Sequence, residues 1–304
     1  MLANANKKPK LTQTLTVTDF YTKPLPVILK KLLLLLISIL FLSCNSHKEK
    51  PTEINVLFIG NSLTYYHDMP QTVQEMLNET NPNIKIDQST FPGISLNSHL
   101  NFILIDKEKN RRRKKVEGEI TATEKKIAQK KWDVVIMQEG TVRLLIPEVI
   151  EFQVNPAIEQ IKSLVNNPNC RFIIFNTWPS KKEYPKEYCY PGMIVDESLV
   201  PDKKYCSPII NNKEQELKLI NTAYKSVSNK NNIEKTDNGN LFFQVEKENP
   251  EIELLEDQIH PSELGAFLNA CVFYQILTNK KATDLKYYGK LDRNTANNLK
   301  KLAE

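Results

Sequence analysis

The sequence predicts a three-layer α/β/α domain with a parallel central sheet. Short runs of β-branched and aromatic residues alternate along the chain with stretches of helical appearance such as residues 156–165, a pattern typical of parallel sheets covered by helices on both faces. The predicted strands are residues 54–59, 134–137, 171–175 and 241–245. Ligands of such sheets bind at the carboxyl ends of the strands, so functional residues are expected there.

The N-terminal part of the chain, residues 1–43, is interpreted as an export signal. Its apolar run, residues 32–42, follows two lysines and is too short to span a bilayer comfortably. A run of this kind that closes on a small residue and a cysteine resembles the lipobox of bacterial lipoproteins, in which Cys44 would be lipidated. An ordinary cleaved signal or an uncleaved anchor is the alternative. Residues 44–52 would then be a tether and residues 53–304 the folded domain, held in the cell envelope by a lipid anchor.

The charge of the chain depends on this signal. Residues 1–43 hold six lysines and one aspartate, so the remaining chain has 35 basic and 35 acidic residues. A balanced charge gives no indication of nucleic-acid binding.

The first predicted strand, residues 54–59, continues directly into Gly60, Asn61 and Ser62. Glycine permits a sharp turn, after which the serine hydroxyl can project above the edge of the sheet. Taken alone, a serine after a strand is usually a turn residue or a helix cap. A helix is expected next, over residues 70–77. This part of the chain is therefore predicted to be a strand, a tight turn and a helix.

Two insertions interrupt the alternating pattern. Residues 106–131 contain eleven basic and five acidic residues and are expected to form a solvated helix or helical hairpin, with binding of an anionic polymer or lipid headgroup as the alternative. Residues 180–208 are rich in Tyr and Pro and contain Cys189 and Cys206. In an oxidising compartment these two cysteines are the first pair to expect in a disulfide. The cysteine spacings do not match a zinc site, and no metal is expected.

Near the C-terminus, Asp257 and His260 precede Pro261 and a predicted amphipathic helix over residues 262–277. Proline is favoured at the start of a helix, which places the Asp and the His on the preceding loop. An Asp three residues before a His can reach the same imidazole. Together with Ser62, these residues provide the nucleophile, base and carboxylate that a serine hydrolase needs.

Two other histidines could in principle act as the base. His67 is close to Ser62 in sequence, and His99 lies on a probable helix. A surface or pocket-wall position is the more ordinary role for both.

Four sequence blocks resemble those of the SGNH, or GDSL, hydrolase family. Residues 60–63 (GNSL) resemble the first block and residues 257–261 (DQIHP) the last, while residues 91–95 (FPGIS) and 132–140 (WDVVIMQEG) resemble the second and third. The blocks occur in the order of the family and bracket nearly all of the predicted domain. The resemblance implies a flavodoxin-like sandwich and an esterase that requires no metal or organic cofactor.

The resemblance also implies an oxyanion hole. Its donors would be the N–H groups of Ser62 and Gly93 and the side-chain amide of Gln138. The chain departs from the commoner family pattern at Asn61, where Asp is usual, and at Gln138, where Asn is usual. Glutamine keeps the carboxamide on a longer stem and resembles the Gln-x-Gly form of some branches of the family.

These features predict an esterase that removes O-acyl, chiefly O-acetyl, groups from carbohydrate outside the cytoplasm. Aromatic residues near the predicted strand ends could stack on sugar rings or only pack the second insertion: Trp178, Tyr184, Tyr188 and Tyr190. One alternative is a lysophospholipase or thioesterase acting on longer acyl chains, with its basic insertion facing membrane headgroups. Another is a non-catalytic surface lipoprotein that binds a glycan or a protein.

Overall fold

The structure, a computed structural model, describes residues 27–28, 31, 52–106 and 109–304. The predicted lipidation site Cys44, and almost all of the segments predicted to be signal and tether, lie outside these residues. Pro51–Glu304 form one compact unit. Within the described ranges, no helix combines the length and the apolar character needed to cross a membrane.

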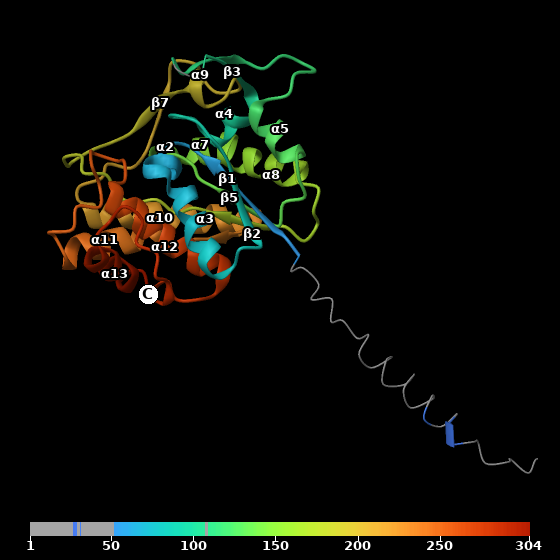
Figure 1. Cartoon of the computed structure of the whole chain (residues 1–304). Helices are drawn as coiled ribbons and strands as arrows, with labels where there is room; N and C mark the ends of the chain where they lie inside the picture. Colours follow the sequence, from blue (N-terminus) through green and yellow to red (C-terminus); the bar gives the residue numbers. More distant parts are fainter. Residues whose placement is uncertain (1–26, 29–30, 32–51, 107–108) are drawn as a thin grey trace, which may run out of the picture. The chain divides into compact units, whose positions relative to one another are not determined.

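Five parallel strands form the central sheet, with helices on both of its faces (Figure 1). They are β1 (Ile54–Gly60), β2 (Ile84–Thr90), β5 (Val134–Met137), β6 (Arg171–Ile174) and β9 (Glu234–Lys235). Their spatial order is β2-β1-β5-β6-β9. Counted in chain order along the sheet this is 2-1-3-4-5, the flavodoxin-like order, and the predicted three-layer α/β/α fold with a parallel sheet is confirmed.

Strand β1 shows why a continuous apolar run forms the centre of the sheet. Its side chains alternate between the two faces, so Val56 and Phe58 enter one hydrophobic core and Leu57 and Ile59 enter the other. All four side chains are fully buried. A strand covered on both faces has no polar side to expose, which is why its sequence does not alternate.

Each core is completed by its own helices. The core of Val56 and Phe58 also holds residues of α3 (Met69–Thr80), α11 (Asn238–Glu248), α12 (Glu263–Thr278) and α13 (Arg293–Leu302). The core of Leu57 and Ile59 holds residues of α4 (Leu96–Asn101), α5 (Ala122–Ala128), α8 (Asn155–Leu164) and α10 (Lys213–Asn231). Short elements connect these layers: α2 (Ser62–Tyr65), η1 (Tyr66–Asp68), α6 (Thr141–Leu144), α7 (Pro147–Val149), η2 (Ile150–Val154) and η3 (Ala282–Asp284).

Two predictions about the C-terminal part of the chain were wrong: a strand over residues 241–245 and an amphipathic helix over residues 262–277. Residues 241–245 lie in helix α11 and not in a strand. Phe242 and Val245 are both buried and lie three residues apart, which is helical periodicity. The last strand is β9, which has only two residues, both of them charged and exposed. The predicted C-terminal helix is present as α12, but it is buried on most sides and is not amphipathic.

The charged insertion is not a helical hairpin. Strand β3 (Phe102–Asp106) pairs with the antiparallel strand β4 (Arg111–Lys114), and α5 follows. The apolar residues at the start of β3 favour a strand. The charged residues that follow form β4, which pairs with β3. Helix α5 begins with a capping box between Thr121 and Glu124.

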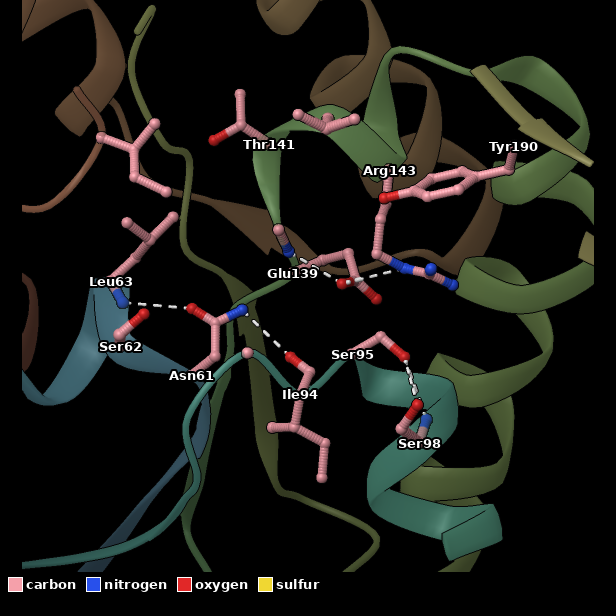
Figure 2. A pocket seen from close by; sticks show the side chains of 14 residues that line it. Asn61, Ser62, Leu63, Ile94, Ser95, Ser98, Glu139, Thr141, Arg143 and Tyr190 are labelled. Atoms are coloured by element: carbon pink, nitrogen blue, oxygen red, sulfur yellow. Dashed lines mark hydrogen bonds and ion pairs between the residues drawn. The ribbon is translucent and has the colours of Figure 1, made fainter. Parts of the chain in front are cut away.

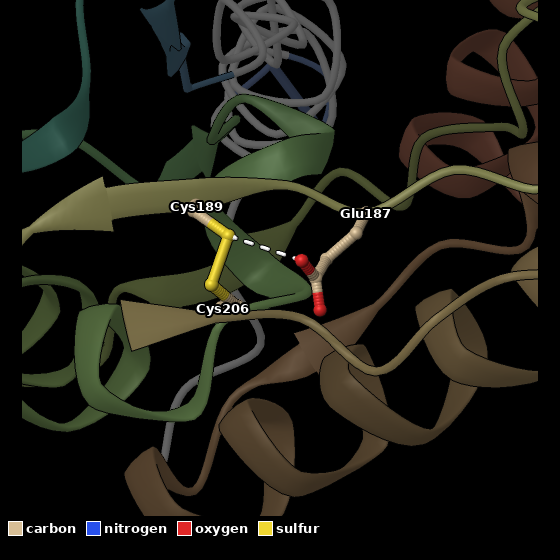
Figure 3. A group of neighbouring side chains, drawn as sticks. All are labelled: Glu187, Cys189 and Cys206. Carbon is tan, nitrogen blue, oxygen red and sulfur yellow. Dashed lines mark hydrogen bonds between the residues drawn. A yellow bond between two sulfur atoms is a disulfide. The ribbon is translucent and has the colours of Figure 1, made fainter. Parts of the chain in front are cut away.

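The second insertion contains the antiparallel strands β7 (Cys189–Pro191) and β8 (Lys204–Cys206), with the short helix α9 (Gly192–Val195) between them. Cys189 and Cys206 lie opposite each other across the strands and form a disulfide, as Figure 3 shows. The Glu187 carboxylate lies beside the two sulfur atoms. Because these sulfurs are bonded to each other, they are not available as the thiolates that a metal would bind.

Candidate active site

Ser62, His260 and Asp257 meet at the carboxyl end of β1. Ser62 and His260 are 198 residues apart in sequence, yet Ser62 Oγ lies 2.9 Å from His260 Nε2. On the other side of the ring, His260 Nδ1 lies 2.6 Å from Asp257 Oδ2. When Nδ1–H donates to the carboxylate, Nε2 is left to accept the serine proton, which is the arrangement of a Ser-His-Asp triad.

The loop around Asp257 keeps this carboxylate charged. Its Oδ1 accepts hydrogen bonds from the backbone N–H groups of Ile259 and His260, both at 2.7 Å. Burial favours the neutral acid, but the hydrogen bonds from the His260 backbone, the His260 ring and Ile259 outweigh it and hold the pKa of Asp257 at about 2. Asp257 is therefore ionised at neutral pH and can fix the tautomer of His260.

Two aromatic residues hold the loop of His260. The ring of Tyr66 stacks on the imidazole of His260 with centroids 4.2 Å apart and planes inclined by 6°. Trp178 donates from Nε1 to the carbonyl of Ile259 at 3.0 Å. Sequence reasoning missed Tyr66, because its partner His260 lies far along the chain.

The turn that carries Ser62 requires a glycine at position 60. A Cβ on Gly60 would lie 2.5 Å from Thr64 Oγ1 and 2.8 Å from Gln138 Oε1. These two groups are hydrogen-bonded to each other at 3.1 Å in the buried space below the turn. Gly60 is therefore needed for the close approach of its neighbours, and its φ is not positive.

Gln138 does not take the position predicted for an oxyanion donor. Its Oε1 accepts from the backbone N–H of Asn61 at 2.9 Å, and its Nε2 donates to the carbonyl of Glu139 at 2.7 Å. The side chain is 1% exposed. The longer stem of Gln lets the amide turn into the interior below the Ser62 turn, where its hydrogen bonds are satisfied. The structure makes Gln138 a positioning residue for this turn.

Asn61, the other departure, links two of the sequence blocks. Its Oδ1 caps helix α2 by accepting from Leu63 N–H at 3.1 Å, as an Asp would. Its Nδ2 donates to the carbonyl of Ile94 at 3.0 Å, which a carboxylate could not do. Asn61 thus attaches the segment of Gly93 and Ile94 to the Ser62 turn.

The Ser62 hydroxyl opens onto a cavity of about 290 Å³. Ser62 and Leu63 lie on one side of it and Ser98, Arg143 and Tyr190 on the other (Figure 2). Gly93 also lines it and has a φ of +55°, a left-handed conformation that favours glycine. Ser62 is the first residue of α2, so its N–H has no acceptor within the helix.

A buried ion pair forms part of the cavity wall. Glu139 accepts hydrogen bonds from the N–H groups of Leu96 at 3.0 Å and Gly140 at 2.8 Å, and its Oε1 lies 3.3 Å from Arg143 Nε. Burial raises the pKa of Glu139, although the charge of Arg143 and the two N–H groups oppose it. This pair was not predicted. The signal was a Glu four residues before an Arg, at the spacing of a helical ion pair.

The two alternative histidines lie elsewhere. His67 Nε2 is 2.6 Å from Glu256 Oε2, next to the triad loop. His99 is buried, with Nε2 3.0 Å from the carbonyl of Gly60 and Nδ1 2.6 Å from Thr123 Oγ1. Since a carbonyl only accepts, Nε2 carries the proton and Nδ1 accepts from the Thr123 hydroxyl. In the described part of the chain, the ring that reaches the Ser62 hydroxyl belongs to His260.

Burial of His99 predicts a loss of stability in acid. Burial lowers the pKa of His99 to about 4, although its bond to Gly60 opposes the shift. Between pH 6.5 and 4 the unfolded chain binds this proton and the folded chain does not, so stability falls as the pH falls, by about 3 kcal/mol in total. Urea unfolding across this range should show a shallower pH dependence for His99→Gln than for the parent. Equal slopes for His99→Gln and the parent would contradict the prediction.

Solved structures with the same architecture were found by comparison. A DUF4886 family protein from Bacteroides uniformis has 17% identity and a TM-score of 0.61, with 83% of this chain and 93% of that chain covered. A protein from Slackia heliotrinireducens that has been assigned to the SGNH hydrolases has 19% identity and a TM-score of 0.51, with 74% and 100% covered. A variant of an acetyl xylan esterase from Geobacillus stearothermophilus has 15% identity and a TM-score of 0.48, with 75% and 95% covered.

No family model matches the sequence, and no curated protein matches it. The first two similarities show that the chain shares the three-layer α/β/α fold of these solved structures. Because these identities are low, the reaction has to be inferred from the geometry of the site and not from the similar structures.

Proposed function

We propose that this protein is a serine esterase of the SGNH type that hydrolyses short O-acyl esters. The observation that carries the proposal is the hydrogen-bonded series from Ser62 through His260 to Asp257, with the serine hydroxyl open to a cavity. A protein that only binds a ligand has no need for a serine, an imidazole and a carboxylate in this geometry.

The reaction would be an acyl transfer in two steps. His260 Nε2 removes the proton of Ser62 as Oγ attacks the ester carbonyl, and the same proton then goes to the leaving alcohol. Water repeats the sequence on the acyl-enzyme and releases the acid. Asp257 stabilises the imidazolium that forms in each step, which its low pKa allows.

The backbone N–H groups of Ser62 and Gly93 are the proposed oxyanion donors. Single donors of this kind contribute about 3 kcal/mol to transition-state stabilisation. Gln138 would support them indirectly, because it holds the backbone N–H of Asn61 and so the turn that carries Ser62.

The size of the cavity favours a short acyl group. A volume of about 290 Å³ is at the lower end of the range for sites that bind small molecules, roughly 300–1,000 Å³. It suits an acetyl group with part of the alcohol better than a long acyl chain. Of the aromatic residues considered for sugar stacking, Tyr190 lines the cavity, whereas Trp178 is buried and stacks on Phe242. We therefore propose an O-acetyl ester of carbohydrate as the substrate.

The test is hydrolysis of aryl esters with acyl chains of increasing length. The parent protein should hydrolyse the acetate, and Ser62→Ala should not. A fluorophosphonate should label the parent at Ser62, located by peptide mass spectrometry. Activity that rises steadily toward long acyl chains would favour the lysophospholipase or thioesterase alternative. A folded parent without turnover or labelling, and with glycan binding unchanged in Ser62→Ala, would favour the non-catalytic binding protein.

We also propose that the chain is exported and lipidated at Cys44. The disulfide between Cys189 and Cys206 supports the export, because such bonds persist in oxidising compartments. Metabolic labelling with a fatty acid should label the parent and leave Cys44→Ala unlabelled. Equal labelling of both proteins, or of neither, would reject this anchor.

Removal of the Tyr66 ring should slow turnover without weakening substrate binding. The stack on His260 is expected to contribute about 1 kcal/mol to holding the imidazole in place, so Tyr66→Ala should lower kcat for aryl acetate by about fivefold, with little change in KM. Tyr66→Phe keeps the ring and should behave like the parent. An unchanged kcat in Tyr66→Ala would show that the stack has no role in positioning the base.

A further inference from the structure

A second cavity adjoins the one at Ser62. Its volume is about 510 Å³, and it shares Ser95, Ser98 and Arg143 with the first cavity. Figure 2 shows that these three side chains lie on the side of the first cavity away from Ser62. The two cavities therefore adjoin each other at these three residues.

The walls of the second cavity come from both insertions and from helix α4. Helix α9 and the residues after it provide Met193, Ile194 and Glu197, while Asn97 lies on α4 and Lys114 on β4. Residues of both insertions thus line the cavity that adjoins the one at Ser62.

We propose that the second cavity binds the sugar units of a neutral oligosaccharide whose acyl group is placed at Ser62. This inference rests on the proposed esterase function and specifies its substrate: the ester of an extended glycan in preference to that of a single sugar. The alcohol portion of the ester would lie across Ser98 and Arg143 and continue into the second cavity.

The side chains of this cavity suit a polyhydroxylated ring. Asn101 Nδ2 donates to Asn97 Oδ1 at 2.7 Å, which leaves Asn97 Nδ2 as a donor and Asn101 Oδ1 as an acceptor for a ligand. The Ser98 hydroxyl accepts from Ser95 Oγ at 2.9 Å and can still donate its own proton. Met193 and Ile194 line the same cavity, are 58% and 52% exposed, and together present an apolar patch of the kind that can mark a binding surface. Sugar rings have hydroxyl groups at the edge and apolar C–H faces, so they can use both kinds of wall.

The charges of the cavity argue against an anionic headgroup. Arg143 is already paired with the buried Glu139. Among the described residues that line this cavity, the other charged side chains are Lys114, which is cationic, and Asp196 and Glu197, which are anionic. Recognition of phosphate requires an excess of cationic donors, which this wall does not offer. A neutral glycan is therefore favoured over a lysophospholipid.

The disulfide is placed to keep the apolar wall in position. Cys189 and Cys206 join the strands on the two sides of α9, at the base of the segment that carries Met193 and Ile194. A wall that is already ordered before binding loses less conformational entropy when the ligand arrives.

The experiment compares the full chain with variants on three substrates: an aryl acetate, an acetylated monosaccharide and an acetylated neutral oligosaccharide. The parent should have a kcat/KM about tenfold or more higher for the oligosaccharide than for the monosaccharide. Asn97→Trp, which fills the cavity, and the double variant Met193→Ala/Ile194→Ala should remove this preference and leave aryl acetate hydrolysis unchanged. Val200→Ala is the matched control, because Val200 is an exposed apolar residue of the same insertion that does not line the cavity.

Binding of the unacylated oligosaccharide, measured by calorimetry, keeps this inference separate from the proposed function. Loss of binding in Asn97→Trp, with binding intact in Val200→Ala, would support the subsite even in a protein without turnover. Aryl acetate hydrolysis without any preference for the oligosaccharide, and without binding of it, would overturn the subsite and leave the esterase standing. A preference for lysophospholipid that Asn97→Trp removes would assign the cavity to a lipid and overturn the inference.

Discussion

Replacement of His260 by Ala is expected to lower kcat/KM for aryl acetate by about 10⁴- to 10⁶-fold. Its Nε2 lies 2.9 Å from Ser62 Oγ, and without it the hydroxyl would have to lose its proton to water. Steady-state hydrolysis, followed by release of the aryl alcohol, measures the effect. The protein should remain folded, because His260 lies on a loop at the edge of the domain.

The controls for this prediction follow from the geometry. The double variant Ser62→Ala/His260→Ala should be no less active than either single variant, because the two groups act as one unit. Asp257→Asn should lose about 10⁴-fold, because an amide donor at this position would favour the wrong tautomer of His260. His67→Ala should retain parent activity within a few-fold, since His67 pairs with Glu256. Retention of more than about a hundredth of parent activity by His260→Ala would contradict the proposed triad.

Replacement of Gly265 by Ala should destabilise the protein by about 3 kcal/mol. The usual effect of this change inside a helix is the opposite, a gain of about 0.5–1 kcal/mol. Here a Cβ would lie 2.2 Å from the carbonyl oxygen of Leu254, a backbone atom that cannot rotate away. The same carbonyl accepts from Ser262 N–H at 2.8 Å, so its displacement would disturb the start of α12.

Chemical denaturation gives the free energy of unfolding for this test. Gly140→Ala is the matched control, because a Cβ there would meet no atom closer than 3.8 Å. Its midpoint should stay within about 1 kcal/mol of the parent. A Gly265→Ala protein as stable as the parent would show that the first turn of α12 can shift away from Leu254 at little cost.

The central strands could be predicted because their signal is local. Residues 54–59, 134–137 and 171–175 are compact apolar runs, and each overlaps an observed strand. Strand β9 carries no such signal, since its position at the sheet edge allows a pair of exposed charged residues to form it. Strand β2 was also missed. It lies at the edge of the sheet and pairs only with β1, so it does not need a continuous apolar run, and polar residues interrupt its apolar ones.

The orientation of Gln138 could not be predicted from its position in the third block. The resemblance identified a carboxamide after β5, but the direction of that side chain depends on the space below Gly60 and on the free N–H of Asn61. Both belong to the end of β1 and the turn after it, which are distant from Gln138 in sequence. The same holds for Tyr66, whose partner His260 lies almost two hundred residues further along the chain.

Local chemistry was therefore sufficient to predict the layered fold and to select Ser62, His260 and Asp257 as candidates. Glycine at a turn, proline at a helix start and apolar runs act within a few residues, so they can be recognised without the fold. Packing decided the direction of the Gln138 side chain, which histidine meets the serine, and which residues of the two insertions line the adjoining cavity. These outcomes depend on contacts between segments far apart in sequence, and such contacts form only when the chain folds.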